Sequence, residues 1–302
     1  MKKILALLLA LVMLVGTLAG CTGEPQSGDP VGSQTQAPTT TDGSGAPEPT
    51  QDQPDTAYVD AYKSTFSESI TSMNPYCTEY TSDYVFIANI IEGLVETDKY
   101  GRSVPCMAES WEANEDFSVW TFHLRPDVYW VDCNGEVLGP VTAQDFVDAL
   151  QYVLTPAYAS STASLVTPYV AGAEDYYNYL FYKASAENGT MAEDGTTYTL
   201  EADGSVTAAA ADGTTTSYAP VDFDTVGVKA VDEHTLTYTL CFDFPGFVSL
   251  LSYAPYEPAY GPLLEELGDQ FCTSAETACS CGAFYLAEYV PLESWVTVSY
   301  TH

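Results

Sequence analysis

The first 57 residues of this 302-residue chain have the composition of a targeting segment and a polar linker. We therefore expect the folded part to begin at about residue 58. Lys2 and Lys3 precede a short apolar run over residues 4–18, and small residues close it. This layout is typical of a cleaved secretory signal, and the run is too short for an ordinary membrane span. We therefore expect a signal peptide over residues 1–20 and a mature chain outside the cytoplasm.

The sequence Leu-Ala-Gly-Cys at residues 18–21 resembles the bacterial lipobox, in which the cysteine is diacylated and becomes the new N-terminus. Acyl chains on Cys21 would anchor the protein to the extracytoplasmic face of the cell membrane, each buried methylene contributing about 0.8 kcal/mol. The alternative is an ordinary cleaved signal in which Cys21 has no role.

Residues 21–57 are rich in Pro, Gly, Ser, Thr, Gln and Asp, with almost no large apolar side chain. Such a segment cannot bury enough surface to offset its ordering entropy, so we predict a disordered tether. About 245 residues remain from Tyr58 onward, enough for one large domain or two smaller ones.

The chain is strongly acidic, with 42 Asp and Glu against 8 Lys and Arg and a formal net charge of −34. Such a surface repels phosphate backbones and excludes a nucleic-acid partner. An excess of acidic side chains usually keeps a protein surface solvated and soluble. The functional alternative is that the acidic surface attracts cationic ligands.

Eight cysteines occur, and seven remain if Cys21 is lipidated, an odd number that cannot be fully paired within one chain. Cys272, Cys279 and Cys281 are close in sequence, but no His is near them and the second pair of a zinc site is missing. We expect no metal and no cofactor, and we treat these cysteines as small buried apolar residues.

The sequence carries no recognisable catalytic motif. Its three histidines, His123, His234 and His302, show no metal-ligand spacing, and there is no nucleophile elbow, phosphate-binding loop or dinucleotide fingerprint. We therefore assign no catalytic residue and do not expect an enzyme. The 23 Tyr and 4 Trp suit a ligand cleft, because their rings combine apolar faces with a polar group.

Apolar side chains spaced by three and four positions predict helices over about residues 82–93, 142–155 and 262–267. In the first, Ser82 or Asp83 is the expected capping residue. In the second, Thr142 and Asp145 form an expected capping box.

Alternation with a period of two predicts strands over residues 58–70, 119–124, 235–242, 284–290 and 295–300. In the second of these, Trp120, Phe122 and Leu124 share one face. In the third, Phe242 is expected to point inward with Tyr238.

Three Asp-Gly pairs begin at Asp194, Asp203 and Asp212, nine residues apart. They predict a β-meander within about residues 187–218, with two-residue turns in which both residues tolerate positive φ. The alternative is a disordered polar insertion, because residues 208–211 have weak strand preference.

An ordered set of short motifs carries a family likeness from about Tyr62 to Tyr300. The motifs occupy residues 73–75, 91–98, 101–105, 108–112, 120–125, 141–147, 226–232 and 282–286. Together they resemble the successive signatures of the extracellular solute-binding proteins of family 5, the oligopeptide- and dipeptide-binding group.

The resemblance implies an α/β fold, the first lobe of a type II periplasmic-binding-protein-like architecture with an inserted α+β subdomain. It places the core of that lobe at residues 58–82 and 226–302 and the subdomain at 83–225. The meander is an addition to the family pattern, and Cys281 stands where Asn is usual. Family members continue with a second lobe, so the resemblance also implies that this lobe is absent here.

The resemblance further implies a receptor that captures peptides outside the membrane for an ABC permease and works as a monomer. Ser72, Met73 and Asn74 match a segment whose backbone lines the cleft, and Phe284 matches an aromatic position near the ligand. The alternatives are a simple turn before Pro75 and core packing for Phe284. The acidic group that pairs with a peptide's amino terminus belongs to the second lobe. Two alternative functions remain. The same fold could bind a non-peptide solute such as nickel, haem or an oligosaccharide, or the chain could be a surface adhesin or a chaperone-like module.

Overall fold

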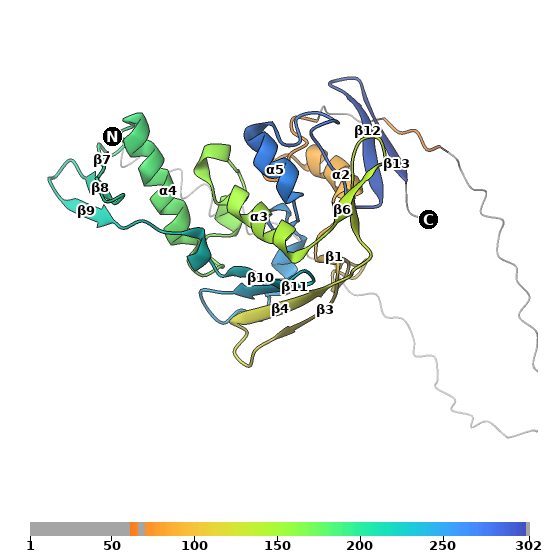
Figure 1. Cartoon of the computed structure of the whole chain (residues 1–302), viewed down its shortest axis with the longest axis horizontal. Coiled ribbons are helices and arrows are strands. Elements are labelled where there is room, and N and C mark those ends of the chain that lie inside the picture. The colour runs from red at the N-terminus through yellow and green to blue at the C-terminus, as the bar shows by residue number, and fades with distance from the viewer. Residues whose placement is uncertain (1–60, 66–69, 300–302) are drawn as a thin grey trace, which may run out of the picture. The chain divides into compact units, whose positions relative to one another are not determined.

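The computed structural model describes residues 61–65 and 70–299 (Figure 1). The expected signal peptide, the lipidation site Cys21 and the tether lie outside the described residues. The chain separates into two units, residues 1–62 and 63–302, and the helices and strands named here belong to the second. Within the described ranges, no helix is both long and apolar enough to cross a bilayer.

A four-stranded antiparallel sheet with the order β10-β11-β4-β3 organises this unit. Its strands are β3 (Ala108–Ala113), β4 (Val119–Leu124), β10 (Val228–Asp232) and β11 (Thr235–Thr239). The predicted alternation in β4 is confirmed, because Trp120, Phe122 and Leu124 are all buried, and Trp120 pairs with Tyr238 of β11. The sheet combines strands from both the proposed lobe core and the proposed subdomain, and the division between those two ranges stays a prediction.

Helix α3 (Ala143–Val153) packs against β10 and β11. The expected capping box is present, with the Thr142 N–H donating to the Asp145 carboxylate at 2.7 Å. The Trp130 indole N–H donates to the same carboxylate at 3.2 Å, which ties the start of the helix to β5 (Tyr129–Val131).

Helix α2 (Thr81–Ile90) starts near its predicted position but ends three residues before Gly93. It ends there because the N–H groups of Cys281 and Gly282 both donate to the Ile90 carbonyl at 2.9 Å, while Ile91 adopts an extended conformation. The capping role expected for Ser82 or Asp83 is wrong, since Tyr80 occupies the N-cap and Asp83 points toward residues 71–78 instead.

The meander is confirmed as a three-stranded sheet beside helix α4 (Ala173–Asn188) (Figure 1). Its strands are β7 (Thr197–Leu200), β8 (Val206–Ala209) and β9 (Thr215–Tyr218). The expected two-residue turns are wrong, because Leu200 pairs with Val206 across a longer connection in which Gly204 alone has positive φ. The Asp203 carboxylate instead accepts the Ser205 N–H at 3.0 Å, as in a turn followed by a glycine bulge.

The strand predicted over residues 235–242 ends early, at Thr239, because Leu240 bridges to Val170 of another segment. Phe242 is consequently 47% exposed rather than inward-facing. Of the strand predicted over residues 58–70, the described positions 61–65 and 70 form none.

The remaining regular elements agree with expectation near the C-terminal end. The predicted short helix corresponds to α5 (Gly261–Leu267), and the last two predicted strands form the antiparallel pair β12 (Phe284–Val290) and β13 (Ser294–Ser299). Two further hairpins join β1 (Val95–Thr97) to β2 (Ser103–Pro105) and β5 to β6 (Val137–Pro140).

Candidate ligand-binding site

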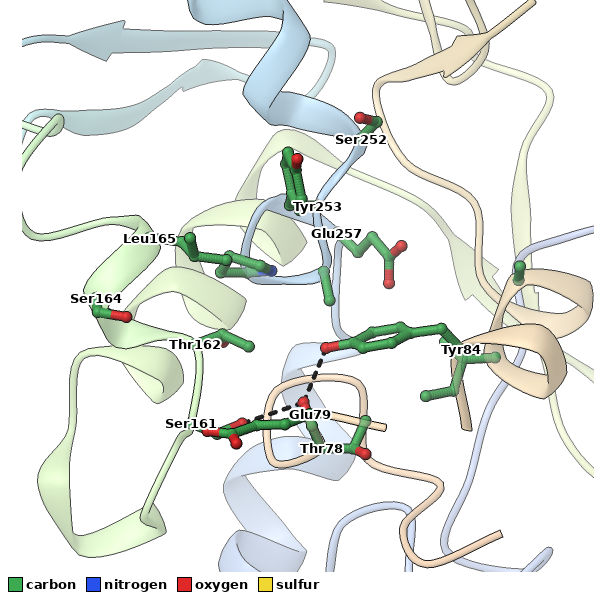
Figure 2. Close-up of a pocket in the computed structure, with 14 residues that line it drawn as sticks. Thr78, Glu79, Tyr84, Ser161, Thr162, Ser164, Leu165, Ser252, Tyr253 and Glu257 are labelled. Carbon is green, nitrogen blue, oxygen red and sulfur yellow. Dashed lines mark hydrogen bonds between the residues drawn. The ribbon is translucent and has the colours of Figure 1, made fainter. Parts of the chain in front are cut away.

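A pocket of about 430 Å³ lies where three segments distant in sequence meet (Figure 2). The first segment is α2 and the loop before it, the second surrounds the short helix η2 (Ala163–Leu165), and the third follows the short helix η4 (Phe247–Ser252). Hydroxyl, aromatic and acidic side chains form its polar lining: Thr78, Glu79, Tyr84, Ser161, Thr162, Ser164, Ser252, Tyr253 and Glu257.

The Thr78 carbonyl joins two of these segments. It accepts hydrogen bonds from the Tyr84 hydroxyl at 2.9 Å and from the Ser161 hydroxyl at 3.1 Å (Figure 2). One residue earlier in the second segment, the Ser160 hydroxyl donates to the Tyr76 carbonyl at 2.8 Å. We call these three hydrogen bonds, Tyr84–Thr78, Ser161–Thr78 and Ser160–Tyr76, the pocket seam. The seam holds one side of the pocket in place, because each of the two buried carbonyls accepts a hydrogen bond from the opposite segment.

Asp83 holds the loop that precedes the pocket. Its carboxylate accepts hydrogen bonds from the Thr71 N–H at 2.9 Å, the Ser72 N–H at 3.1 Å and the Thr78 hydroxyl at 2.6 Å. Burial by itself raises the pKa of Asp83, but the hydrogen bonds from Thr71, Thr78 and Ser72 outweigh it and bring the pKa below its usual value. A carboxylate that accepts several hydrogen bonds is stabilised in its charged form, so Asp83 acts as a charged anchor for this loop.

Glu257 is the acidic group of the third segment. It follows the short helix η5 (Ala254–Tyr256), and its backbone is extended, as expected for a residue before Pro258. Figure 2 shows its side chain extending toward the side of the pocket formed by Tyr84. The residue is half-buried as a whole, but its Oε2 atom is closed off from solvent and has no hydrogen-bond partner. Burial raises the pKa of Glu257 to about 8.

The four residues that the resemblance assigned to the ligand do not line this pocket. Met73 and Asn74 are buried, and the Asn74 amide is used inside the fold, donating to the Tyr152 hydroxyl at 3.0 Å and accepting the Tyr76 N–H at 3.0 Å. Ser72 and Phe284 are half-buried, Phe284 at the start of β12. A ligand role for Ser72, Met73, Asn74 and Phe284 stays a prediction.

Sequence reasoning missed the side chains that do line the pocket. Tyr, Ser and Thr are too common in this chain to single out Tyr84, Ser161 or Tyr253. Glu257 did carry a signal, because it is the one charged residue within the otherwise uncharged residues 247–264. A lone carboxyl in an apolar stretch is buried by its neighbours, and such groups concentrate at functional sites.

A second group of possible ligand atoms lies away from the pocket. Side-chain atoms of Glu92, Glu96 and Cys106 lie within 4.8 Å of one another. The Cys106 thiol donates to Glu92 at 3.3 Å and to Glu96 at 3.5 Å, and burial together with these two carboxylates raises the pKa of the thiol. In the structure, the hydrogen bonds of the Cys106 thiol thus link it to both carboxylates.

Comparison with known proteins gives a consistent picture. Residues 102–302 match the family model described as bacterial extracellular solute-binding proteins, family 5 Middle. The oligopeptide-binding protein AliB of Streptococcus pneumoniae is 32% identical over 59% of this chain and 21% of its own length. The periplasmic oligopeptide-binding protein OppA of Haemophilus influenzae is 35% identical over 72% of this chain and 32% of its own length. The chain thus spans between about a fifth and a third of these relatives.

Solved structures show the same likeness. The substrate-binding domain of an oligopeptide ABC transporter from Bacillus anthracis str. Ames superposes with a TM-score of 0.60 at 26% identity, covering 78% of this chain and 37% of that chain. Haemophilus influenzae OppA in complex with RPPGFSPFR gives a TM-score of 0.57 at 27% identity, covering 76% of this chain and 36% of that chain. The predicted α/β fold of the periplasmic-binding type is confirmed, and the described part is compatible with a single lobe.

Proposed function

Because the chain belongs to family 5 of the bacterial extracellular solute-binding proteins, we propose that it forms one wall of a peptide-binding cleft in a receptor that feeds an ABC importer. The observation that carries the proposal is the pocket between α2, η2 and the segment after η4, in a fold shared with oligopeptide-binding proteins. Such a receptor captures its ligand without converting it, so the function requires no catalytic group.

The chemistry of the pocket supports a peptide as ligand. Its volume of about 430 Å³ is within the usual range for sites that hold small molecules. Tyr84 and Tyr253 supply aromatic surface, and Ser164 and Ser252 supply hydroxyl groups. Hydroxyls suit the alternating N–H and C=O groups of a peptide backbone, because a hydroxyl both donates and accepts.

The regions of the relatives outside the matched segment supply, in this proposal, the opposite wall of the cleft and the contacts to the permease. A cleft receptor gains affinity when two walls close on the ligand and exclude water. The backbone at Ser72, Met73 and Asn74 and the ring of Phe284 are proposed to contribute at the margin of the same cleft, in a monomeric receptor.

A lipid anchor on Cys21 is the proposed means of keeping the receptor at the membrane. The support is the lipobox-like sequence and the acidic, polar tether that comes after it. Cys21→Ser should move the protein from the membrane fraction into the medium, and mass spectrometry of the wild-type N-terminus should show two acyl chains. Membrane association of the Cys21→Ser protein, together with a wild-type N-terminus free of lipid, would refute the anchor.

Peptide binding itself is tested by titrating the ¹⁵N-labelled chain with tetra-alanine and following amide resonances by NMR. We expect saturable shifts concentrated at Thr78, Ser161 and Ser252, with weak affinity because each backbone hydrogen bond to an open wall contributes only about 1 kcal/mol. Free alanine at equal concentration is the control. A lack of shifts at these positions, or an equal response to free alanine, would contradict the proposal.

A further inference from the structure

The unpaired carboxyl of Glu257 requires an explanation. Most buried polar atoms in proteins have a hydrogen-bond partner, because burying one without a partner is unfavourable. The Glu257 Oε2 atom has none, yet it lies beside a pocket that is open to a ligand. The partner that the fold does not supply is one that a ligand in the pocket can supply.

The charge of that partner can be inferred from the residues around the pocket. None of its lining residues is Lys, Arg or His. The described arginines are engaged elsewhere, Arg102 with Asp98 and Arg125 with Asp127. A second acidic side chain, the exposed Glu79, lies on the same pocket.

The described lysines likewise make their contacts away from the pocket lining. Lys183 pairs with Glu187, Lys229 donates to the Asp224 carbonyl, and Lys99 lies over the ring of Tyr100. Lys63 lies among residues 61–65, which do not line the pocket. The Lys and Arg residues in the described part of the chain therefore provide no cation for Glu257, and a ligand is the source of positive charge that we consider.

We propose that Glu257 is the counter-ion for a cationic group of the bound peptide, an ammonium or guanidinium, and that the pocket selects ligands which place such a group there. The inference rests on the proposed peptide-binding function and adds a preference to it. The cation we propose is a basic side chain, because the family resemblance places the acidic partner of the terminal amine in the second lobe. The terminal amine is the alternative that the test must distinguish, since it too presents N–H donors with a positive charge.

The protonation state of Glu257 gives this assignment a measurable consequence. Burial raises the pKa of Glu257 to about 8, so near neutral pH the carboxyl is mostly protonated until a cation binds. The charge of Glu257 contributes to a raised pKa at three other titratable groups. They are Tyr76 in the loop before α2, Tyr84 on α2 and Cys281 before β12. Burial, followed by the charge of Glu257, raises the pKa of Tyr84 to about 12, and burial also raises the pKa values of Tyr76 and Cys281. These three groups stay neutral, so binding of a cation near pH 7 should release a proton from Glu257.

The test compares matched peptides on the full chain and two variants. Ala-Lys-Ala-Ala carries a side-chain ammonium, and its norleucine counterpart has the same length without the charge; both are used with free and with acetylated amino termini. Glu257→Gln removes the charge and keeps the shape, and Glu266→Gln, at an exposed carboxylate outside the pocket lining, is the control.

We expect the wild type and Glu266→Gln to bind the lysine peptide about tenfold more tightly than its norleucine counterpart, and Glu257→Gln to lose that preference. If the terminal amine is the cation instead, acetylation will weaken binding and Glu257→Gln will abolish this dependence. Equal affinity for charged and uncharged peptides in the wild type, or a preference that survives Glu257→Gln, would overturn the inference while leaving peptide binding intact.

A probe that does not depend on peptide binding separates the two proposals. n-Butylammonium is titrated into the chain at pH 7, and the ¹³Cδ resonance of Glu257 is assigned by its absence in Glu257→Gln. We expect this resonance to move toward the ionised carboxylate. A response to butylammonium without any peptide binding would support the counter-ion and contradict the proposed function. An unresponsive Glu257 resonance would overturn the counter-ion.

Discussion

The Nδ2 atom of Asn74 donates a hydrogen bond of 3.0 Å to the hydroxyl oxygen of Tyr152, which joins the turn before α2 to helix α3. The same amide accepts the Tyr76 N–H through its oxygen, so both ends of the side chain are used. Asn74 is 5% exposed. Its position next to Pro75 therefore serves to lock a long-range contact as well as to shape a turn.

Replacing Asn74 by Ala should lower the free energy of unfolding by about 2 kcal/mol, because a buried tyrosine hydroxyl and a backbone N–H lose their partner. Urea unfolding monitored by circular dichroism measures the change. Asn89→Ala is the control, since the exposed Asn89 side chain bonds only to its own helix, and it should change stability by less than about 0.5 kcal/mol. Equal stability of Asn74→Ala and wild type would show that the contact is not important for the fold.

Asp83 should make stability depend on pH. Its pKa is lowered in the folded protein, so its contribution is complete above the unfolded-state pKa of about 3.9 and is lost as pH falls through the lower folded value. At pH 7, Asp83→Asn should cost about 3 kcal/mol, because hydrogen bonds to a charged group are lost.

The difference between wild type and Asp83→Asn should shrink as the pH drops below about 4. Urea unfolding at a series of pH values gives this curve. Asp243→Asn, at an exposed position, is the control and should track the wild type throughout. A stability difference that stays constant between pH 7 and pH 3 would contradict the anchoring role of Asp83.

Much of the fold was predictable because its signals are local. The alternation in β4 and the capping box of Thr142 and Asp145 each depend on neighbours within a few residues, and both were predicted correctly. Phe242 was not, because its exposure depends on where Leu240 meets Val170.

The candidate site was less predictable than the fold. Asp83 satisfies every local criterion for a helix cap, but Thr71, Ser72 and Thr78 compete successfully for its carboxylate. The pocket depends on a hydrogen bond between Thr78 and Ser161, which are far apart in the sequence. No local sequence pattern predicts such a long-range contact. The family resemblance supplied the architecture and the proposed ligand class, but it did not point to Glu257.

Gly172 should be much less tolerant of substitution than Gly213, although both have positive φ, 71° and 88°. A Cβ on Gly172 would lie 2.6 Å from the Thr225 carbonyl oxygen, whereas a Cβ on Gly213 would meet nothing within 4 Å. Gly213→Ala should cost about 1 kcal/mol from the left-handed conformation alone, and Gly172→Ala about 3 kcal/mol because a backbone atom must also move. Thermal unfolding of the two variants makes the comparison, and equal costs would contradict the close approach of Gly172 to residue 225.

The meander should be dispensable for binding. Its strands pack on α4, partly through the stacked rings of Tyr182 and Tyr198, and none of its residues lines the pocket. Replacing residues 196–218 by a short Gly-Ser link should leave peptide affinity within about threefold, because distant sites act independently. Tyr84→Phe, which removes a hydroxyl from the pocket seam, is the contrasting variant and should weaken binding. A hundredfold loss on removal of the meander would place it in the site.

The location of the peptide on this chain is the central claim, and photo-crosslinking tests it most directly. A tetrapeptide carrying a diazirine side chain is bound, irradiated and mapped by mass spectrometry of the digested protein, with excess unlabelled peptide as competitor. We predict competed adducts within residues 161–165 and 252–257, the two pocket segments outside α2 and its preceding loop. Competed adducts confined to the meander or to the four-stranded sheet, with both pocket segments unmodified, would contradict a peptide site in this pocket.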